Sequence, residues 1–172
     1  RSHDLACAAH EAARGAVAAD AAARASGAGA TPSAPDPCLA PEEVIGIVLG
    51  AFARNDLPHA NAGVATAFAF ASPANRAVLG SVERFAELVR DDTYRPLLYH
   101  ARTARGGVRI DGERATQRVV VTAVGGERVV YTFTLSRQVD GAYKGCWMTD
   151  GVTREPPSSL RAPQLAAAAW RA

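Results

Sequence analysis

Residues Phe68–Arg76, "FAFASPANR", decide how the middle of this chain folds. Alternating Phe and Ala has the period of a half-buried strand, yet the residues before it are rich in alanine, which favours helix and is depleted in strands. The alanine content from Ala62 to Ala71, after a cap at Asn61, therefore predicts a helix. Ser72 ends this helix, because the residue before Pro73 is driven out of the α region, and Ser72 can also cap a new short turn.

Two further helices are predicted on either side of this stretch. Pro41 starts the first, because proline suits the first helical turn and the two glutamates that follow it favour the positive end of the helix dipole. An apolar stripe at helical spacing continues to Phe52, and residues 55–58 end the helix. The other helix is capped by Ser81 and repeats the stripe from Val82 to Val89.

The second half of the chain is predicted to form antiparallel strands. They are expected at residues 97–103, 108–110, 115–124, 127–139 and 143–149. Gly125 and Gly126 form a hairpin turn between the two longest strands. One face of the second of these is predicted to be buried and the other largely wet, and the buried face comprises Val129, Tyr131, Phe133 and Leu135. Helices followed by a meander of strands indicate an α+β fold with the helices packed on one face of a curved sheet.

Composition divides the chain into three parts. Residues 1–37 are rich in alanine and end in a proline-rich breaker, residues 38–155 form a single α+β domain, and residues 156–172 are a tail or a short helix. The first part is helical, flexible or the remnant of a transit peptide, which its compositional bias resembles. A chain that begins with Arg1 is either processed or a fragment. The expected compartment is accordingly the cytoplasm or, for a transit remnant, a chloroplast or another organelle.

Charge and cysteine content disfavour several classes of function. The 19 basic and 17 acidic residues are interspersed and leave a net charge of +2, which disfavours nucleic acid as a partner. The chain has no uncharged apolar run of about 18 residues, so no membrane span is predicted. Cys7, Cys38 and Cys146 show neither the spacing of a zinc site nor the even count of a disulfide framework, so reduced thiols are expected. Neither a metal nor a cofactor is predicted.

Two separated stretches carry a resemblance to a known family. The chain resembles the domain-of-unknown-function family numbered 4864 through residues 61–98, NAGVATAFAFASPANRAVLGSVERFAELVRDDTYRPLL, and residues 135–152, LSRQVDGAYKGCWMTDGV. The resemblance covers about residues 41–155 and implies a nuclear-transport-factor-2-like fold, the cone-shaped α+β fold of ketosteroid isomerases and SnoaL-type polyketide cyclases. The family has no assigned activity, and enzymes, binding proteins and assembly modules share this cone. The resemblance therefore implies a fold rather than a function.

Four residues are candidates for acid–base chemistry. Isomerases of this superfamily hold a carboxylate or a histidine inside an apolar cone, with Tyr or Asp donors for an oxyanion. The resemblance thus draws attention to Tyr131, the polar group on the predicted buried strand face, and to His100, Asp56 and Asp92. Each also has a structural interpretation: Tyr131 suits a core, His100 can face solvent, and the two aspartates end helices.

A ligand pocket lined by aromatic side chains is expected inside the cone. Its predicted members are Phe52, Phe68, Phe70, Phe85, Tyr99, Tyr131, Phe133 and Trp147. A place in the core or at the rim is favoured for Trp147 over stacking on a ligand. A polar loop of Ser72, Asn75 and Arg76 either binds a carboxylate or phosphate or hydrogen-bonds the chain between two helices, and the second interpretation is favoured.

The expected function follows from this apolar interior. The chain is predicted to be a non-catalytic module that binds a small hydrophobic molecule or a protein, with homodimerisation through the outer face of the sheet. One alternative is a SnoaL-type isomerase, cyclase or dehydratase that acts on a small hydrophobic carbonyl compound. The other alternative is an accessory or assembly protein of an organelle.

Overall fold

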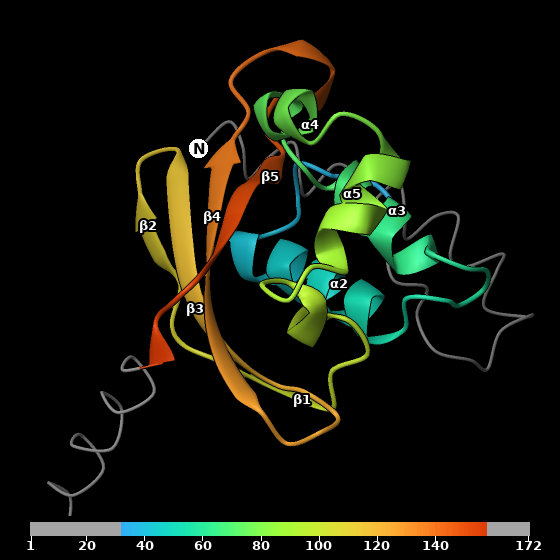
Figure 1. Cartoon of the computed structure of the whole chain (residues 1–172). Helices are drawn as coiled ribbons and strands as arrows, with labels where there is room; N and C mark the ends of the chain where they lie inside the picture. The colour runs from blue at the N-terminus through green and yellow to red at the C-terminus, as the bar shows by residue number, and fades with distance from the viewer. Residues whose placement is uncertain (1–31, 158–172) are drawn as a thin grey trace, which may run out of the picture. The chain divides into compact units, whose positions relative to one another are not determined.

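The computed structural model describes residues 32–157, and those from Ser33 onward lie in one compact unit. Most of the predicted N-terminal segment and C-terminal tail therefore lie outside the described residues. Within them, the α-helices are α2 (Pro41–Ala53), α3 (Ala62–Ala69), α4 (Pro73–Leu79) and α5 (Val82–Val89). Figure 1 shows these helices gathered on one side of an antiparallel sheet, which confirms the predicted α+β class.

The opening stretch is helical, as its alanine content predicts. Helix α3 ends at Ala69, and the Ser72 hydroxyl caps α4 by accepting the Asn75 N–H at 3.2 Å. The predicted short turn after Ser72 is thus a seven-residue helix. Only Ala71 of this stretch takes part in β-type pairing, through a single parallel bridge with Thr149. The stretch therefore joins the helical layer to the last strand of the sheet.

The connection between α2 and α3 is held by one buried polar side chain. Asn55 is 1% exposed, and its Oδ1 accepts the Val64 N–H at 3.0 Å. Its main-chain oxygen accepts the Gly63 N–H at 2.8 Å, where a Cβ at position 63 would lie 2.1 Å from the Ala51 oxygen. Glycine is therefore required for the close approach of the two helices.

The sheet contains five strands, all paired antiparallel. They are β1 (Arg102–Arg105), β2 (Arg109–Asp111), β3 (Arg114–Thr122), β4 (Arg128–Arg137) and β5 (Trp147–Arg154). Their order is β1-β3-β4-β5, and β2 pairs with β3 beside β1. Strand β5 is therefore an edge strand of the sheet, and α4 and the Ala71 bridge lie beside it.

Two predicted strand boundaries are wrong. The strand expected at 97–103 begins only at Arg102, because the 3-10 turn η1 (Arg95–Leu97) and the left-handed Tyr99, with a φ of 54°, interrupt extended backbone. The strand expected at 143–149 begins only at Trp147 and continues to Arg154. A second 3-10 turn, η2 (Gly141–Tyr143), occupies the start of the predicted range.

The core lies between the helices and the inner face of β3 and β4. The inner face of β4 is as predicted, since Val129, Tyr131, Phe133 and Leu135 are all buried. The opposite face is less wet than expected, because Val130 is 3% exposed and its polar neighbours are half-buried. Alternation along one strand shows which residues share a face, but it does not reveal what covers the other face.

A β-bulge in β5 sets the geometry next to the helices. Leu135 pairs with Thr149 and Phe133 pairs with Val152, so Thr149 and Val152 both face inward although they are three residues apart. The register shift makes Asp150 the extra residue, and its carboxylate accepts the Ser136 hydroxyl at 2.8 Å. Bulges of this kind re-aim side chains and are common beside functional sites.

The cysteines differ from the prediction of reduced thiols. Cys38 is disulfide-bonded, whereas Cys146 is free and buried. Burial raises the pKa of the Cys146 thiol, which keeps it protonated and unreactive at neutral pH. No group of three or more metal-ligating side chains occurs within residues 32–157. In the same part of the chain, no helix has the length and apolar character that crossing a membrane requires.

Candidate functional site: an apolar pocket between helices and β5

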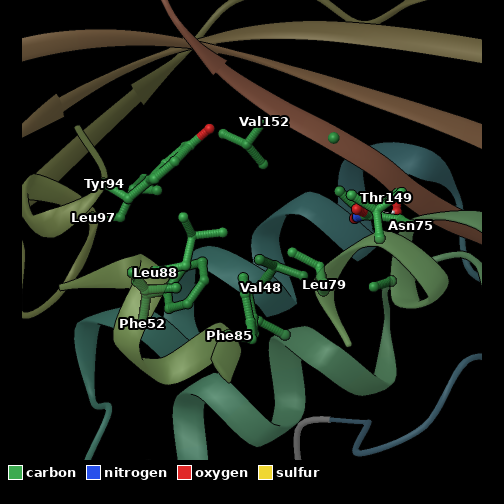
Figure 2. A pocket seen from close by; sticks show the side chains of 15 residues that line it. Val48, Phe52, Asn75, Leu79, Phe85, Leu88, Tyr94, Leu97, Thr149 and Val152 are labelled. Atoms are coloured by element: carbon green, nitrogen blue, oxygen red, sulfur yellow. Dashed lines mark hydrogen bonds between the residues drawn. The ribbon is translucent and has the colours of Figure 1, made fainter. Parts of the chain in front are cut away.

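A pocket of about 250 Å³ lies between the helices and strand β5. Its apolar wall is formed by side chains from α2, α5, η1 and β5, including Val48, Phe52, Phe85, Leu88, Leu97 and Val152. Figure 2 shows Tyr94 and Leu97 at one end of the pocket and Asn75 and Thr149 at the other. Val78 of α4 and Leu88 of α5 line it while remaining 77% and 42% exposed, so the pocket opens to solvent beside these helices.

The pocket wall carries almost no ionisable chemistry. None of the described residues that line it has a carboxylate, imidazole, thiol, ammonium or guanidinium group. The polar side chains on the wall are Tyr94, Asn75 and Thr149. Such a surface favours neutral, largely apolar molecules, because a charged group enters an apolar site only at a large desolvation cost.

Asn75 and Thr149 form the polar end of the pocket. The Asn75 Nδ2 donates to the main-chain oxygen of Thr149 at 3.0 Å, and the Ser72 N–H donates to the same oxygen at 2.9 Å. The Thr149 N–H in turn donates to the Phe70 oxygen at 2.8 Å. Together these bonds fix the start of α4 to β5. The backbone segments that carry Asn75 and Thr149 are therefore held next to each other.

The Thr149 hydroxyl is buried and unsatisfied within the part of the chain that the structure describes. Thr149 is 5% exposed, and its Oγ1 has no partner among the described residues. An unsatisfied buried hydroxyl of this kind destabilises a fold by about 1–3 kcal/mol. The other such atom in this part of the chain is Oε1 of Gln117, which lies in a separate groove on the sheet. Thr149 is thus the unsatisfied group associated with the pocket.

The polar loop predicted from the sequence divides between two roles. Asn75 lines the pocket, whereas Ser72 serves as the α4 cap. Arg76 donates from Nε to the Phe68 oxygen at 3.0 Å, from Nη2 to the Ala69 oxygen, and from Nη1 to the Tyr143 hydroxyl at 3.0 Å. The guanidinium therefore hydrogen-bonds the end of α3 rather than lining the pocket.

The aromatic side chains predicted to line the pocket are placed in three ways. Phe52 and Phe85 line it, and Phe68 contacts the ring of Phe85 with centroids 6.1 Å apart. A second group is fully buried in the core and comprises Phe70, Tyr131 and Phe133. Tyr99 is 46% exposed, and Trp147 packs against the core as the favoured interpretation had it. Large rings are more often core than binding surface in this fold.

Tyr131 is fully buried and acts as a hydrogen-bond donor. Its hydroxyl donates to the Thr93 oxygen at 2.7 Å, and burial raises the pKa of the phenol to about 12. Tyr131 is not among the residues that line the pocket. The side chain therefore connects the core to the chain before η1 and stays neutral at physiological pH.

The other three acid–base candidates lie apart from the pocket wall. Hydrogen bonds from the Tyr99 hydroxyl and the Asn61 N–H hold the pKa of Asp56 below its usual range. The His100 Nδ1 lies 2.8 Å from the Leu97 oxygen, and Asp92 forms an exposed ion pair with Arg95 at 3.1 Å. None of these side chains lines the pocket, so the four candidates do not converge there.

Several pocket residues were not singled out from the sequence. Leu88 lies off the apolar stripe of α5, and Val78 and Leu79 belong to a helix that was expected to be only a turn. Thr149 and Val152 face inward together because of the bulge, which alternation alone does not reveal. The tail of "FAFASPANR" was the available signal, since it contains Asn75.

The fold and the pocket define an α+β domain with an apolar pocket of about 250 Å³ and no charged side chain among the described residues of its wall. The chain belongs to the family Domain of unknown function (DUF4864), whose model matches residues 40–159. This match confirms the family expected from the two sequence stretches. No curated protein and no solved structure matches the chain.

Proposed function

We propose that this chain is a non-catalytic binding domain that holds a small, neutral, hydrophobic molecule in the pocket between α5 and β5. The supporting observation is the pocket of about 250 Å³ whose wall combines apolar side chains with Tyr94, Asn75 and Thr149. Binding pockets are typically apolar with a few polar groups that fix orientation. The wall described here has that composition.

The distribution of acids and bases favours binding over the isomerase alternative. Proton transfer needs a group within hydrogen-bond reach of the substrate, and its pKa must suit the working pH. Among the candidates, Asp56 accepts three hydrogen bonds and has a lowered pKa, and Tyr131 has a pKa raised to about 12. Neither lines the pocket. A general base for a carbonyl substrate is therefore not supported.

The proposal includes the nuclear-transport-factor-2-like cone as the fold type. Supporting features are the helices that precede the sheet, the antiparallel meander and the pocket between the two layers. In the cone fold, helices cover the concave face of a curved sheet and leave a cavity. Superposition of an experimentally determined structure on members of that superfamily tests this part of the proposal.

A dye titration with a matched pair of leucine variants tests binding. The neutral fluorescent dye N-phenylnaphthylamine is titrated into the full chain and into Leu88→Gln and Leu57→Gln. Leu88 lines the pocket, whereas Leu57 does not line it and is 68% exposed. We expect Leu88→Gln to weaken dye binding about tenfold, because it replaces apolar surface by an amide, and Leu57→Gln to leave it unchanged.

Both substitutions lie on the surface and should change stability by less than about 0.5 kcal/mol, so the titration compares folded proteins. Equal dye affinity for the two variants would place the dye elsewhere and contradict the proposal. Native mass spectrometry of the purified protein adds a test with natural ligands. A neutral molecule that copurifies with the unmodified chain should be bound less by Leu88→Gln than by Leu57→Gln.

A further inference from the structure

We infer that the ligand of this pocket carries a single oxygen acceptor, such as a ketone or ester carbonyl, which binds between Asn75 and Thr149 while its apolar body fills the rest of the pocket. The inference rests on the proposed binding function and adds the chemical class of the ligand. It follows from two hydrogen-bond donors at one end of a largely apolar wall, whose other polar side chain among the described residues, Tyr94, lies at the opposite end (Figure 2).

The first donor is the side-chain amide of Asn75. Its orientation is fixed by chemistry, because the group next to the Thr149 main-chain oxygen must be the NH₂ and not the carbonyl. That NH₂ carries two hydrogens, and one of them makes the 3.0 Å bond to Thr149. Within the described residues, no other protein acceptor is bonded to Asn75 Nδ2, so its second hydrogen is available to a ligand.

The second donor is the Thr149 hydroxyl. This group is buried, lacks a partner among the described residues, and belongs to a residue that lines the pocket. A rotation of χ1 by about 120° moves the hydroxyl to another staggered position, so the oxygen can be turned toward a bound molecule. A valine would fill the same space without leaving a hydroxyl unsatisfied. A ligand oxygen would satisfy the hydroxyl and remove the penalty present in the empty pocket.

The volume of the pocket and the uncharged character of the wall residues described above further restrict the class of ligand. An engineered cavity of about 150 Å³ holds benzene, so the pocket of about 250 Å³ accommodates a larger body, such as a fused bicyclic ring. The described residues of the wall offer no ionised group to pair with a charged ligand. The ligand is therefore a neutral carbonyl compound rather than a carboxylic acid or an amine.

Two isosteric probes test the inference. The ketone β-acetonaphthone and the hydrocarbon β-isopropenylnaphthalene differ in that a CH₂ group replaces the carbonyl oxygen. We expect the full chain to bind the ketone about tenfold more tightly than the hydrocarbon, as one well-placed hydrogen bond allows. Thr149→Val should abolish most of this preference while changing hydrocarbon affinity less than about twofold. Thr149→Ser retains the hydroxyl and should retain the preference.

A readout without ligand accompanies the titrations. Thr149→Val should raise the melting temperature of the empty protein, because it removes an unsatisfied buried hydroxyl, whereas Thr149→Ser should not. Equal binding of ketone and hydrocarbon by the unmodified chain would overturn the inference and leave the proposed function standing. Dye binding without binding of either naphthalene would overturn the stated ligand class. Failure of the dye and both naphthalenes to bind would remove the proposed function itself.

Discussion

Individual polar residues hold this fold together at places where helices meet. Asn55 is the clearest case, because its amide contacts both the start of α3 and the chain after η1. Its Nδ2 lies 3.3 Å from the Asn61 Oδ1 and 3.3 Å from the Tyr99 hydroxyl, while its Oδ1 accepts the Val64 N–H. A buried polar network whose members satisfy one another stabilises one arrangement of its elements and penalises loss of any member.

We expect Asn55→Ala to lower the free energy of unfolding by about 2–4 kcal/mol, because it leaves the Val64 N–H and the Tyr99 hydroxyl without this partner. Urea titration followed by circular dichroism measures the change. The neighbouring Arg54→Ala is the control, since Arg54 is exposed, and it should shift stability by less than about 0.5 kcal/mol. A loss below about 1 kcal/mol for Asn55→Ala would contradict the assigned role.

At the scale of elements, α4 is held by residues in its first half rather than by core contacts of its own. None of its residues is buried. The Ser72 cap and the Asn75 amide fix its start, and Arg76 binds the carbonyl oxygens at the end of α3 and the Tyr143 hydroxyl of η2. The guanidinium also lies over the Tyr143 ring, 4.9 Å from its centroid. The planar fork of arginine suits this arrangement and the ammonium of lysine does not.

We therefore expect Arg76→Lys to lower the free energy of unfolding by about 1–2 kcal/mol, because it keeps the charge but loses the fork. Thermal and urea unfolding measure the loss. Arg84→Lys, at an exposed position on α5, is the matched control and should have little effect. Equal stability of the two lysine variants would show that charge alone, and not the fork, holds α3 to α4.

The helices could be predicted from the sequence because their signals are local. Pro41, Ser72 and Ser81 mark the starts of α2, α4 and α5 as expected, since a cap depends on its immediate neighbours. The start of β5 and the bulge at Asp150 could not be predicted, because both depend on pairing with β4. The inward position of Thr149 follows from that register. The polar end of the pocket was therefore outside the reach of sequence periodicity.

The pocket wall was also hard to predict for a reason of packing. Aromatic side chains bury large apolar areas, so in this fold Phe70, Tyr131 and Phe133 are taken up by the core. The pocket is left to medium-sized residues at the edge of the core, such as Leu88 and Val152. Aromatic content indicates where the core is, whereas a pocket is found only once the layers are placed.

At the scale of the whole molecule, the charges on the outer sheet face affect the homodimer that the sequence predicts through that face. A groove on that face is lined by Arg109, Arg118 and Arg128, whereas Arg105, which borders the same groove, donates from Nη1 to the Glu42 oxygen of α2. Glu155 accepts two hydrogen bonds from Arg118, at 2.8 and 2.7 Å, and compensates part of this charge. Two copies that meet face to face would still bring arginines of like charge together.

We expect association through this face to be weak at low salt and stronger at high salt, because counterions screen the repulsion. Analytical ultracentrifugation of the full chain across a salt series measures it. Arg109→Glu combined with Arg128→Glu should strengthen association at low salt by removing the like charges. Association that weakens as salt is added would indicate that oppositely charged surfaces meet, and would place the interface elsewhere.

The bulge in β5 has a consequence for how the pocket can change over generations. Thr149 and Val152 face the same cavity because one extra residue, Asp150, lies between the two paired segments of the strand. Removing that residue would reverse which side chains of the strand point inward on one side of it. The pocket is thus encoded partly by the length of the strand. Point substitutions can vary its surface gradually, whereas a single-codon deletion would replace it at once.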